Sequence, residues 1–400
     1  MIYDFLVIGC GASGLFFGAS PAFKNRNLRG LILEKTKHPG TKLLMSGSGQ
    51  CNITHSGSIK DFVNSYGAPG KKIRSALYKY SNDVLIDFLN DGGVPTICRE
   101  DGKIFPRSMK AKDILDLLLK KINQNGFEIK YSSPVIEVNK TDDSWEVKTP
   151  DQTYIAKSII VATGGCSYPT TGSDGQFFDV LKNVSDIDIT PLKPALAAIR
   201  VRDYGYTELS GISFRNVKVR ILPDPKKGGK MKAENIDDLL FTHSDISGPA
   251  VLNISKYADT DDILEVNYLY PKTYEEIFSR LKEVTKDSSA DLHNVLIANF
   301  DLPRRFCKII TENYGPSIKS IAKALTGESF VIKSTGGFAN AMATNGGVVL
   351  SQLDLKSFKH KNLAGLYVIG EACDIDGATG GYNLQFAFSS AWAAAENICE

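Results

Sequence analysis

The stretch YDFLVIGCGASGLFFGAS, residues 3–20, decides the fold. Its apolar run over residues 3–8 is typical of a buried parallel strand, and residues 12–19 are expected to form the helix that leaves this strand. Three glycines lie between and just after these two segments, in the pattern GxGxxG. A strand, a glycine-rich turn and a helix in this order predict the first unit of a dinucleotide-binding α/β domain.

Each glycine of the pattern has a separate physical role. Gly9 permits the tight turn, Gly11 lets the backbone approach a pyrophosphate, and Gly14 lets the helix lie close to the sheet. The next apolar run, LRGLILEK at residues 28–35, ends in Glu34, about twenty residues further on, near the offset expected for an acid that holds ribose hydroxyls. The alternative is a strand–turn–helix that binds nothing, and we favour a bound dinucleotide.

Two later loops decide between NAD and FAD. The strand-like run IIVATGG at 159–165 ends in small residues, and LYVIGEACDIDGATGGYNLQ at 366–385 contains a strand that ends at Gly370 and offers Glu371. Ligands bind at the carboxyl ends of strands in open α/β sheets, so Glu371 is placed to grip a polyol such as ribitol. Each loop alone could be a simple turn, but together they favour a long extended ligand, FAD rather than NAD.

Composition narrows the functional class. The 400 residues include 47 Lys and Arg against 45 Asp and Glu, a formal net charge of +2. This balance gives no electrostatic argument for nucleic acid or an anionic membrane, so we expect neither as a partner. The seven cysteines include no CxxC pair, which predicts no metal site and a reducing, cytoplasmic location.

The chain is too long to fold around a single hydrophobic core, and the pattern of expected helices and strands changes along its length. Residues 1–190 read as an α/β domain, 191–270 as an inserted β-rich domain, and 271–328 as a small helical domain. Return strands are expected over 329–350. The remaining residues, 351–400, complete the α/β domain with a strand and a last helix.

Longer motifs carry a family resemblance. They are VIGCGASG, GTKLLMSGSGQCNITHS, FPRSMKAKDILDLL, IIVATGGCSYPTTGSDG, LLFTHSDISGPAVLNIS, STGGFANAMATNGG and GLYVIGEACDIDGATGGYNLQFAFSSAWAAA. In these, and over nearly its whole length, the chain resembles the BaiN-like bacterial flavoproteins, a family that includes aminoacetone oxidases. The resemblance implies a glutathione-reductase-like FAD domain with a parallel sheet, interrupted by a β-rich domain and a small helical domain.

The resemblance also implies where non-covalent FAD is held. It places the pyrophosphate on Gly9, Gly11, Ala12, Ser13 and Gly14, the adenosine on Glu34, Lys35 and Val135, and the rest of the ADP half on Ala162, Thr163 and Gly164. It places the ribitol by Gly370 and Glu371, and the flavin ring by Gly380, Gly381, Tyr382, Asn383 and Leu384. The segment from Lys42 to Thr54 wraps the middle of the flavin, through Lys42, Ser46, Gly47, Gly49, Cys51 and Asn52.

One position departs from the family pattern. Where the family usually has Gly-Gly-Gly-Arg-Cys-Asn, this chain has Ser46-Gly47-Ser48-Gly49-Gln50-Cys51-Asn52. Gln50 therefore stands in place of an arginine, and a fixed cation near the flavin or substrate is missing. This puts anion recognition at that point in doubt.

The residues expected near the flavin ring do not identify a single reaction. The absence of a paired redox cysteine argues against a disulfide reductase, and no second glycine fingerprint is present for a stably docked nicotinamide. We therefore expect NAD(P)H, if used, to visit the flavin transiently. Tyr382 and His243 are the candidate catalytic residues, with His55 and Tyr168 as further candidates. Tyr382 packed under its loop, and His243 capping a turn, are the structural alternatives.

Three functions remain open. The first is hydride transfer from reduced flavin to an activated C=C bond, such as a steroid or bile-acid enone, a substrate class that the resemblance supplies. Aromatic residues of the insert are expected to form its pocket or, equally, a core: Tyr204, Tyr206, Phe214, Phe241 and Tyr268. The second function is oxidation of a small amine by dioxygen. The third, a flavoprotein that binds nucleic acid, is disfavoured by near-neutral charge without a basic cluster. The sequence leaves the oligomeric state open.

Overall fold

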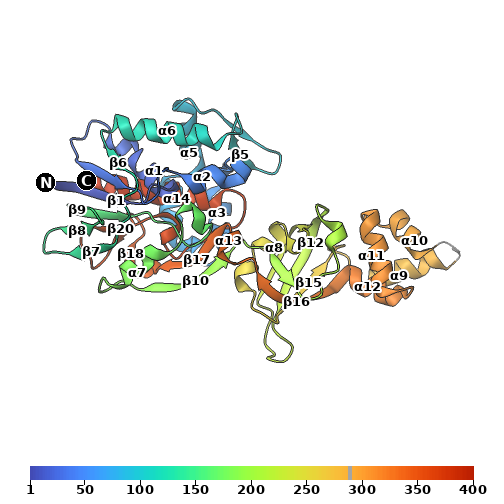
Figure 1. Cartoon of the computed structure of the whole chain (residues 1–400). Helices are drawn as coiled ribbons and strands as arrows, with labels where there is room; N and C mark the ends of the chain where they lie inside the picture. The colour runs from blue at the N-terminus through green and yellow to red at the C-terminus, as the bar shows by residue number, and fades with distance from the viewer. Residues whose placement is uncertain (287–290) are drawn as a thin grey trace. The chain divides into compact units, whose positions relative to one another are not determined.

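The chain folds into two units in the computed structural model, which describes residues 1–286 and 291–400 (Figure 1). Unit 1 comprises Met1–Lys193 and Ala343–Glu400, and unit 2 comprises Pro194–Met342. Each unit has its own hydrophobic core. Unit 2 is therefore an insertion in the sequence of unit 1. No helix in the described part of the chain has the length and apolar character needed to cross a membrane.

A parallel sheet forms the centre of unit 1, with the strand order β20-β9-β1-β2-β6. These strands are β1 (Ile2–Ile8), β2 (Gly30–Leu33), β6 (Glu128–Lys130), β9 (Thr153–Val161) and β20 (Leu366–Val368). In the register, Ile8 pairs with both Leu33 and Val161, and Val161 pairs with Val368. The carboxyl ends of four strands are therefore level, and the loops that follow them emerge side by side.

Antiparallel strands extend this sheet. The hairpin of β7 (Glu137–Lys140) and β8 (Trp145–Lys148) pairs with β9, and β18 (Leu353–Asp354) with β19 (Lys359–His360) continues beyond β20. The expected Rossmann-type fold with a parallel sheet is confirmed.

Helix α14 (Tyr382–Cys399) comes late in the sequence but lies beside elements from its first residues. It packs against α1 (Ala12–Gly18), where the indole N–H of Trp392 donates to the carbonyl oxygen of Phe16 at 3.1 Å. In Figure 1 this red helix lies among the blue elements α1 and β1. The amphipathic α6 (Ala111–Gln124) also packs on α1. The glycine-rich turn that begins α1 is thus supported by elements from distant parts of the sequence.

The part of the chain between β2 and α6 forms a smaller group of helices and strands within unit 1. It contains the helices α2 (Thr41–Met45), α3 (Ile59–Ser65), α4 (Gly70–Lys79) and α5 (Asn82–Asp91). Its three-stranded antiparallel sheet has the order β3-β5-β4, with β3 (Thr54–His55), β4 (Thr96–Cys98) and β5 (Lys103–Pro106). Later in the chain, α7 (Gln176–Lys182) completes the helices of unit 1.

The chain leaves unit 1 and returns to it along neighbouring strands. These are β10 (Ile189–Ala195) and β17 (Ala343–Val348), which form a two-stranded sheet. Gly346 has a φ of +96°, and a Cβ there would lie 2.5 Å from the carbonyl oxygen of Pro191. The two strands therefore approach too closely at this point for a side chain.

Unit 2 contains a closed antiparallel barrel with the order β11-β14-β13-β12-β15-β16. The strands are β11 (Ile199–Val201), β12 (Ser213–Leu222), β13 (Ala233–Phe241), β14 (Ile246–Ser247), β15 (Ile263–Asn267) and β16 (Glu328–Thr335). The helices are α8 (Pro249–Leu252), α9 (Tyr274–Thr285), α10 (Leu292–Asn299), α11 (Arg304–Tyr314), α12 (Ile318–Gly327) and α13 (Gly337–Asn340). The helical domain expected over 271–328 includes residues 287–290, which lie outside the described residues.

Aromatic side chains fill this unit rather than line a pocket. Tyr206, Phe214, Phe241 and Tyr268 are all buried, at 0–5% exposure, and pack ring against ring. Tyr204 is half-buried, and its hydroxyl donates to the carbonyl oxygen of Thr242 at 2.6 Å. Of the two alternatives left open by the sequence, a pocket or a core, these buried rings agree with the core.

A buried carboxylate lies within the same core. Glu328 accepts hydrogen bonds from the hydroxyls of Tyr206, Tyr268 and Tyr314, the last two at 2.6 and 2.7 Å. Burial raises the pKa of the Glu328 carboxyl, opposed by the three hydroxyl donors. Tyr314 belongs to α11 and Glu328 begins β16, so this cluster ties the helices of unit 2 to its barrel.

Candidate functional site

The glycine-rich turn after β1 is as tight as its sequence predicts. Gly9 has a φ of +102°, and a Cβ there would lie 2.6 Å from the carbonyl oxygen of Ala162. A Cβ on Gly14 would lie 2.1 Å from the carbonyl oxygen of Gly9. Helix α1 therefore rests directly on the turn, as the spacing of the glycines requires.

The middle glycine behaves differently. A Cβ on Gly11 would have no atom within 4 Å, although its two partner glycines are tightly enclosed. Ala12 and Ser13 follow at the start of α1, where backbone N–H groups have no partner within the helix. Gly370 adjoins this place from the end of β20, since a Cβ on it would meet the hydroxyl oxygen of Ser13 at 2.6 Å. The backbone around Gly11 thus faces open space with unsatisfied donors, a suitable cradle for phosphates.

Glu34 is buried at the carboxyl end of β2, beside this cradle. It accepts hydrogen bonds from the backbone N–H of Cys10 at 2.8 Å and from the backbone N–H of Thr36 at 2.8 Å. The backbone N–H of Ser133 donates to the carbonyl oxygen of Glu34 at 2.9 Å, so the loop that carries the half-buried Val135 also lies here. The predicted adenosine residues are therefore brought together. Lys35 instead forms an ion pair with Asp174 at 2.6 Å.

Glu371 anchors a polar network at the carboxyl ends of β9 and β20. Its carboxylate accepts from Lys42 Nζ at 2.7 Å, from the Ser167 hydroxyl at 3.1 Å and from the backbone N–H of Thr344 at 2.8 Å. Lys42 also donates to the Ser167 hydroxyl at 2.5 Å. Sequence reasoning identified Lys42 and Glu371 but missed Ser167 and Thr344, which lie 204 and 27 residues from Glu371 in the sequence.

The loop after β9 completes this edge. Gly164 has a φ of +72°, and a Cβ on it would lie 3.1 Å from the Ser173 hydroxyl and 3.6 Å from a carboxylate oxygen of Glu371. Ala162 is held to β1 by its N–H, which donates to the carbonyl oxygen of Ile8 at 2.9 Å. The predicted residues Ala162, Thr163 and Gly164 therefore lie between the Gly9 turn and the Glu371 network.

The segment from Lys42 to Thr54 has an unusual backbone. Several consecutive or near-consecutive residues have positive φ: Gly47, Ser48, Gly49 and Cys51. Glycine adopts such a φ without strain, but Ser48 and Cys51 do so at a cost in conformational energy, which is typical of a loop shaped for a ligand. Ser46 closes its start through a hydrogen bond to the carbonyl oxygen of Leu43 at 2.6 Å.

The end of this segment meets the start of α14. With its amide oriented to satisfy both ends, Asn52 donates to the carbonyl oxygen of Thr54 at 3.0 Å and accepts from the N–H of Gly381 at 3.2 Å. A Cβ on Gly381 would lie 2.7 Å from the carbonyl of Thr54. The fully buried Gln385 accepts from the Thr54 hydroxyl at 2.7 Å. The two loops predicted to flank the ring are thus joined.

The loop before α14 is braced by its own side chains. Asn383 accepts from the N–H of Gly377 at 2.9 Å and donates to the carbonyl oxygen of the same residue at 3.0 Å. Leu384 is half-buried against the core of unit 1. Gly380 and Gly381 both have positive φ, a conformation that glycine adopts without strain. Because both residues are glycines, the turn carries no Cβ atom at these two positions.

Tyr382, the first residue of α14, is held by other rings. Its ring stacks on His55, with centroids 5.4 Å apart, and meets the edges of Phe62 and Tyr66. Its carbonyl oxygen accepts from the hydroxyl of Tyr66 at 2.7 Å. His55 in turn lies between two carbonyl oxygens, of Ser56 at 2.6 Å from Nδ1 and of Asp101 at 3.0 Å from Nε2. The Tyr382 ring is therefore fixed in orientation.

The other two catalytic candidates lie apart from this ring cluster in the sequence. Tyr168 is half-buried with a φ of +53°, close to Ser167 of the Glu371 network. His243 is an exposed residue of unit 2, in the turn between β13 and β14. That turn is closed by hydrogen bonds between Thr242 and Asp245 rather than by the His243 side chain.

Three cysteines near these loops are deeply buried. Cys10, Cys51 and Cys373 are buried with 0% exposure. Burial raises the pKa of the Cys51 thiol to about 12 and also raises the pKa of the Cys10 and Cys373 thiols. A thiol with a raised pKa is a poor nucleophile.

These features fit FAD. A dinucleotide needs room and N–H donors at the middle glycine, an acid at the end of the second strand, and polar groups at the end of a later strand. Gly11, Glu34 and Glu371 meet these needs, and all lie at the level edge of one sheet.

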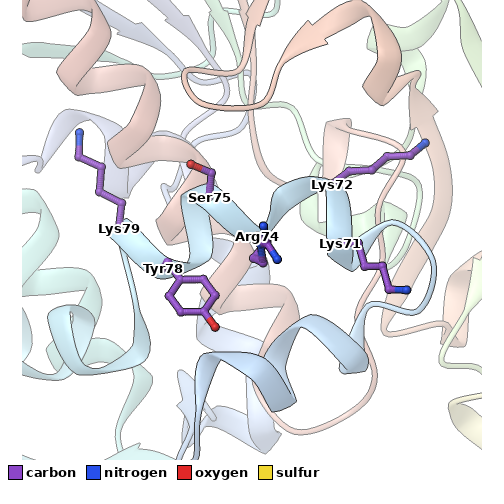
Figure 2. A pocket seen from close by; sticks show the side chains of 6 residues that line it. All are labelled: Lys71, Lys72, Arg74, Ser75, Tyr78 and Lys79. Atoms are coloured by element: carbon purple, nitrogen blue, oxygen red, sulfur yellow. The ribbon is translucent and has the colours of Figure 1, made fainter.

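Unit 1 also carries a basic cluster, contrary to the argument from net charge. Lys71, Lys72, Arg74 and Lys79 are all exposed on α4, which contains no acidic residue (Figure 2). The premise that the chain lacks such a cluster is wrong, because acids elsewhere in the chain balance the total.

Comparisons with known proteins give the family. The model for the HI0933-like protein Rossmann domain matches residues 3–397. The ribosomal RNA dihydrouridine synthase of Escherichia coli is 28% identical over 414 residues, covering 99% of this chain and 98% of the relative. The 3-dehydro-bile acid delta(4,6)-reductase of Clostridium scindens is 25% identical over 411 residues, covering 98% of each.

A solved structure shares the fold. The open conformation of a flavocytochrome c3 fumarate reductase matches 100% of this chain and 78% of that chain, with a TM-score of 0.53 and 14% identity. The match to the family model confirms the resemblance drawn from the motifs. The chain belongs to the HI0933-like Rossmann-domain family and is a FAD-dependent oxidoreductase.

Proposed function

We propose that this protein reduces a C=C bond conjugated to a carbonyl group. The observation that carries the proposal is that two relatives of nearly full length, with different substrates in their names, share this chemistry. A delta(4,6)-reductase of a 3-dehydro bile acid acts on C=C bonds of a ring that bears a ketone. Dihydrouridine is uridine with two hydrogens added across the C5=C6 bond, which is conjugated to the C4 carbonyl.

The substrate that we favour is a uracil base in RNA. The relative named for ribosomal RNA is somewhat more similar than the bile-acid reductase. The steroid enone came from the family resemblance, and the aromatic residues of the insert, which were open as pocket or core, are buried in unit 2. A steroid or bile-acid enone is the second candidate, because it requires the same chemistry and the match to the bile-acid relative covers 98% of this chain.

Particular residues are proposed to hold the cofactor. Reduced FAD, when bound, supplies the hydride to the carbon β to the carbonyl. The cradle around Gly11 would hold its pyrophosphate, Glu34 its adenosine ribose, and Glu371 its ribitol. Lys42 is proposed to keep the Glu371 carboxylate oriented, since its ammonium lies 2.7 Å from that group.

Tyr382 is proposed to donate the proton that completes the reduction at the carbon α to the carbonyl. Its ring is clamped by His55, Phe62 and Tyr66, beside the GGYN loop expected at the flavin. A fixed hydroxyl donates a proton without first having to be oriented. His243 stays a second candidate. A reduced nicotinamide that visits transiently is proposed as the electron source.

The test is anaerobic stopped flow of the purified protein with its flavin fully reduced. We expect uridine-containing RNA to restore the absorbance of oxidised flavin, and nucleoside mass spectrometry to detect dihydrouridine. Reoxidation by a conjugated 3-oxo-steroid and not by RNA would select the second candidate. Fast reoxidation by dioxygen alone would contradict the reductase and favour an amine oxidase.

The same assay tests the proton donor. Tyr382→Phe keeps the ring contacts and removes the hydroxyl, so flavin reoxidation should slow by about 10²–10⁴-fold, with flavin content unchanged. His243→Gln is the parallel variant in unit 2. A Tyr382→Phe protein with normal rates would assign Tyr382 to packing alone.

A further inference from the structure

Helix α4 has one continuous exposed face composed of basic and hydroxyl-bearing side chains. At 100° per residue, its exposed positions fall together on one side: Lys71, Lys72, Arg74, Ser75, Tyr78 and Lys79. Its apolar residues Ile73, Ala76 and Leu77 are buried on the other side. The exposed face lines an open hollow of about 700 Å³ (Figure 2).

Three positive charges on this face are not neutralised. Lys79 pairs with Glu396 of α14 at 2.5 Å, but within residues 1–286 and 291–400 no ion pair involves Lys71, Lys72 or Arg74. Like charges gathered on one helix repel each other, and a protein retains them at some cost to stability. Such a face is complementary to a polyanion.

One residue of this face favours RNA over other polyanions as the ligand. Tyr78 is 58% exposed and lies on the same stripe of the helix as Lys71 and Arg74, at spacings of seven and four residues. An exposed aromatic ring beside cations suits an unstacked base, whose phosphates lie on either side of it. A membrane-binding helix instead presents several apolar residues to the lipid, and those of α4 face the protein.

The helix is also connected to the candidate site. It packs on α3 and α14, which contribute Phe62 and Tyr382 to the ring cluster. Tyr66, just after α3, donates to the carbonyl oxygen of Tyr382. A polyanion held on α4 is therefore bound to a helix that packs directly against the two helices that carry the ring cluster.

We propose that the exposed face of α4 is a docking surface for single-stranded RNA, with Lys71, Lys72 and Arg74 on phosphates and Tyr78 stacked on a base. This inference rests on the proposed function for its choice of RNA. It assigns to α4 the binding of the nucleic acid outside the reacting base.

The experiment measures the affinity of the FAD-loaded protein for a fluorescent single-stranded oligouridine, by anisotropy over a range of salt concentrations. We expect the Lys71→Gln/Lys72→Gln/Arg74→Gln variant to bind about 10–100-fold more weakly near 100 mM salt, because it loses about three phosphate contacts. Its slope of log affinity against log salt should be shallower by about 2. The matched control Lys120→Gln/Lys319→Gln/Lys323→Gln removes three exposed lysines elsewhere and should change affinity by less than about threefold.

A second pair of variants tests the ring. Tyr78→Phe should bind RNA as the wild type does, whereas Tyr78→Ala should lose at least about fivefold. Equal losses in the α4 variant and the lysine control would overturn the proposal, since only net charge would matter. Binding to vesicles of phosphatidylcholine and phosphatidylglycerol that depends on α4, without RNA binding, would overturn it in favour of a membrane surface.

The outcome is separable from that of the proposed function. Reoxidation of reduced flavin by a small soluble enone should be the same in the α4 variant and the wild type, because α4 holds none of the proposed catalytic groups. Loss of RNA affinity in the α4 variant, with no dihydrouridine from the wild type, would support the docking surface and contradict the RNA substrate. Equal production of dihydrouridine in RNA by the wild type and by the α4 variant would contradict the docking surface alone.

Discussion

At the scale of single residues, two glycines of one turn have opposite surroundings. A Cβ on Gly14 would lie 2.1 Å from a backbone oxygen, whereas a Cβ on Gly11 would meet nothing within 4 Å. Gly11 also has a φ of −80°, which any residue adopts. Gly14 is thus required by the fold itself, whereas Gly11 is required only by the molecule that occupies the space beside it.

This contrast predicts two different failures. Gly14→Ala should destabilise the protein by about 1–3 kcal/mol, because α1 must move off the turn, and should also lose flavin. Gly11→Ala should lose flavin while the free energy of unfolding of the flavin-free protein is unchanged or rises by about 0.4–1 kcal/mol. Flavin absorbance per protein and thermal unfolding of both stripped variants measure this. Full flavin content in Gly11→Ala would place the pyrophosphate elsewhere.

The same residues show what a sequence can predict. Gly9, Gly14 and Glu34 were identifiable because their roles depend on spacing within one βαβ unit. Ser167 and Thr344 were not, because each meets Glu371 only after the loop that follows β9 and the start of β17 are folded against the end of β20. The aromatic residues of unit 2 were ambiguous for a related reason, since an alternating strand does not reveal which of its faces a barrel encloses.

At the scale of elements, the β4–β5 hairpin restores a charge that the sequence pattern lacks. Gln50 stands where the family usually has arginine, yet the guanidinium of Arg99 lies 2.6 Å from the Gln50 side-chain oxygen. Arg99 also lies over the ring of Phe105, 4.0 Å from its centroid. The hairpin thus delivers a cation to the same segment from a position about fifty residues further along the chain.

We predict that Arg99 contributes to the binding of an anionic substrate. Arg99→Gln should raise the concentration of RNA needed for half-maximal flavin reoxidation by about 5–30-fold, as expected for loss of one charge-assisted hydrogen bond. The double variant Gln50→Arg/Arg99→Gln should recover much of this loss, because it returns the guanidinium to the family position. A double variant no better than the single one would show that the charge at this segment is irrelevant.

At the scale of the whole molecule, two separate cores predict two unfolding events. Calorimetry of the full chain should resolve one transition for each unit. FAD at about a hundred times its dissociation constant should stabilise the transition of unit 1 by about 2.7 kcal/mol and leave that of unit 2 in place. A single transition that moves as a whole with FAD would contradict this independence.

Glu328 should make the unfolding transition of unit 2 depend on pH. Its pKa is raised by burial above the ordinary value of 4.5, so folding favours the protonated form. That contribution is fully present below pH 4.5 and is lost as pH rises through the folded pKa. Within that window the unit 2 transition should weaken by up to about 1.4 kcal/mol per pH unit. Glu328→Gln should remove this dependence without altering flavin content.

The insertion also fixes an order of events during synthesis on the ribosome. Strand β20 and helix α14, which complete the sheet edge and cover α1, belong to residues 366–399, whereas unit 2 is one uninterrupted stretch. Because domains fold as units while the chain emerges, unit 2 can reach its native state while the first half of unit 1 still waits for its partner strands. The sheet edge proposed to hold the flavin is therefore completed after unit 2, once residues 366–399 have left the ribosome.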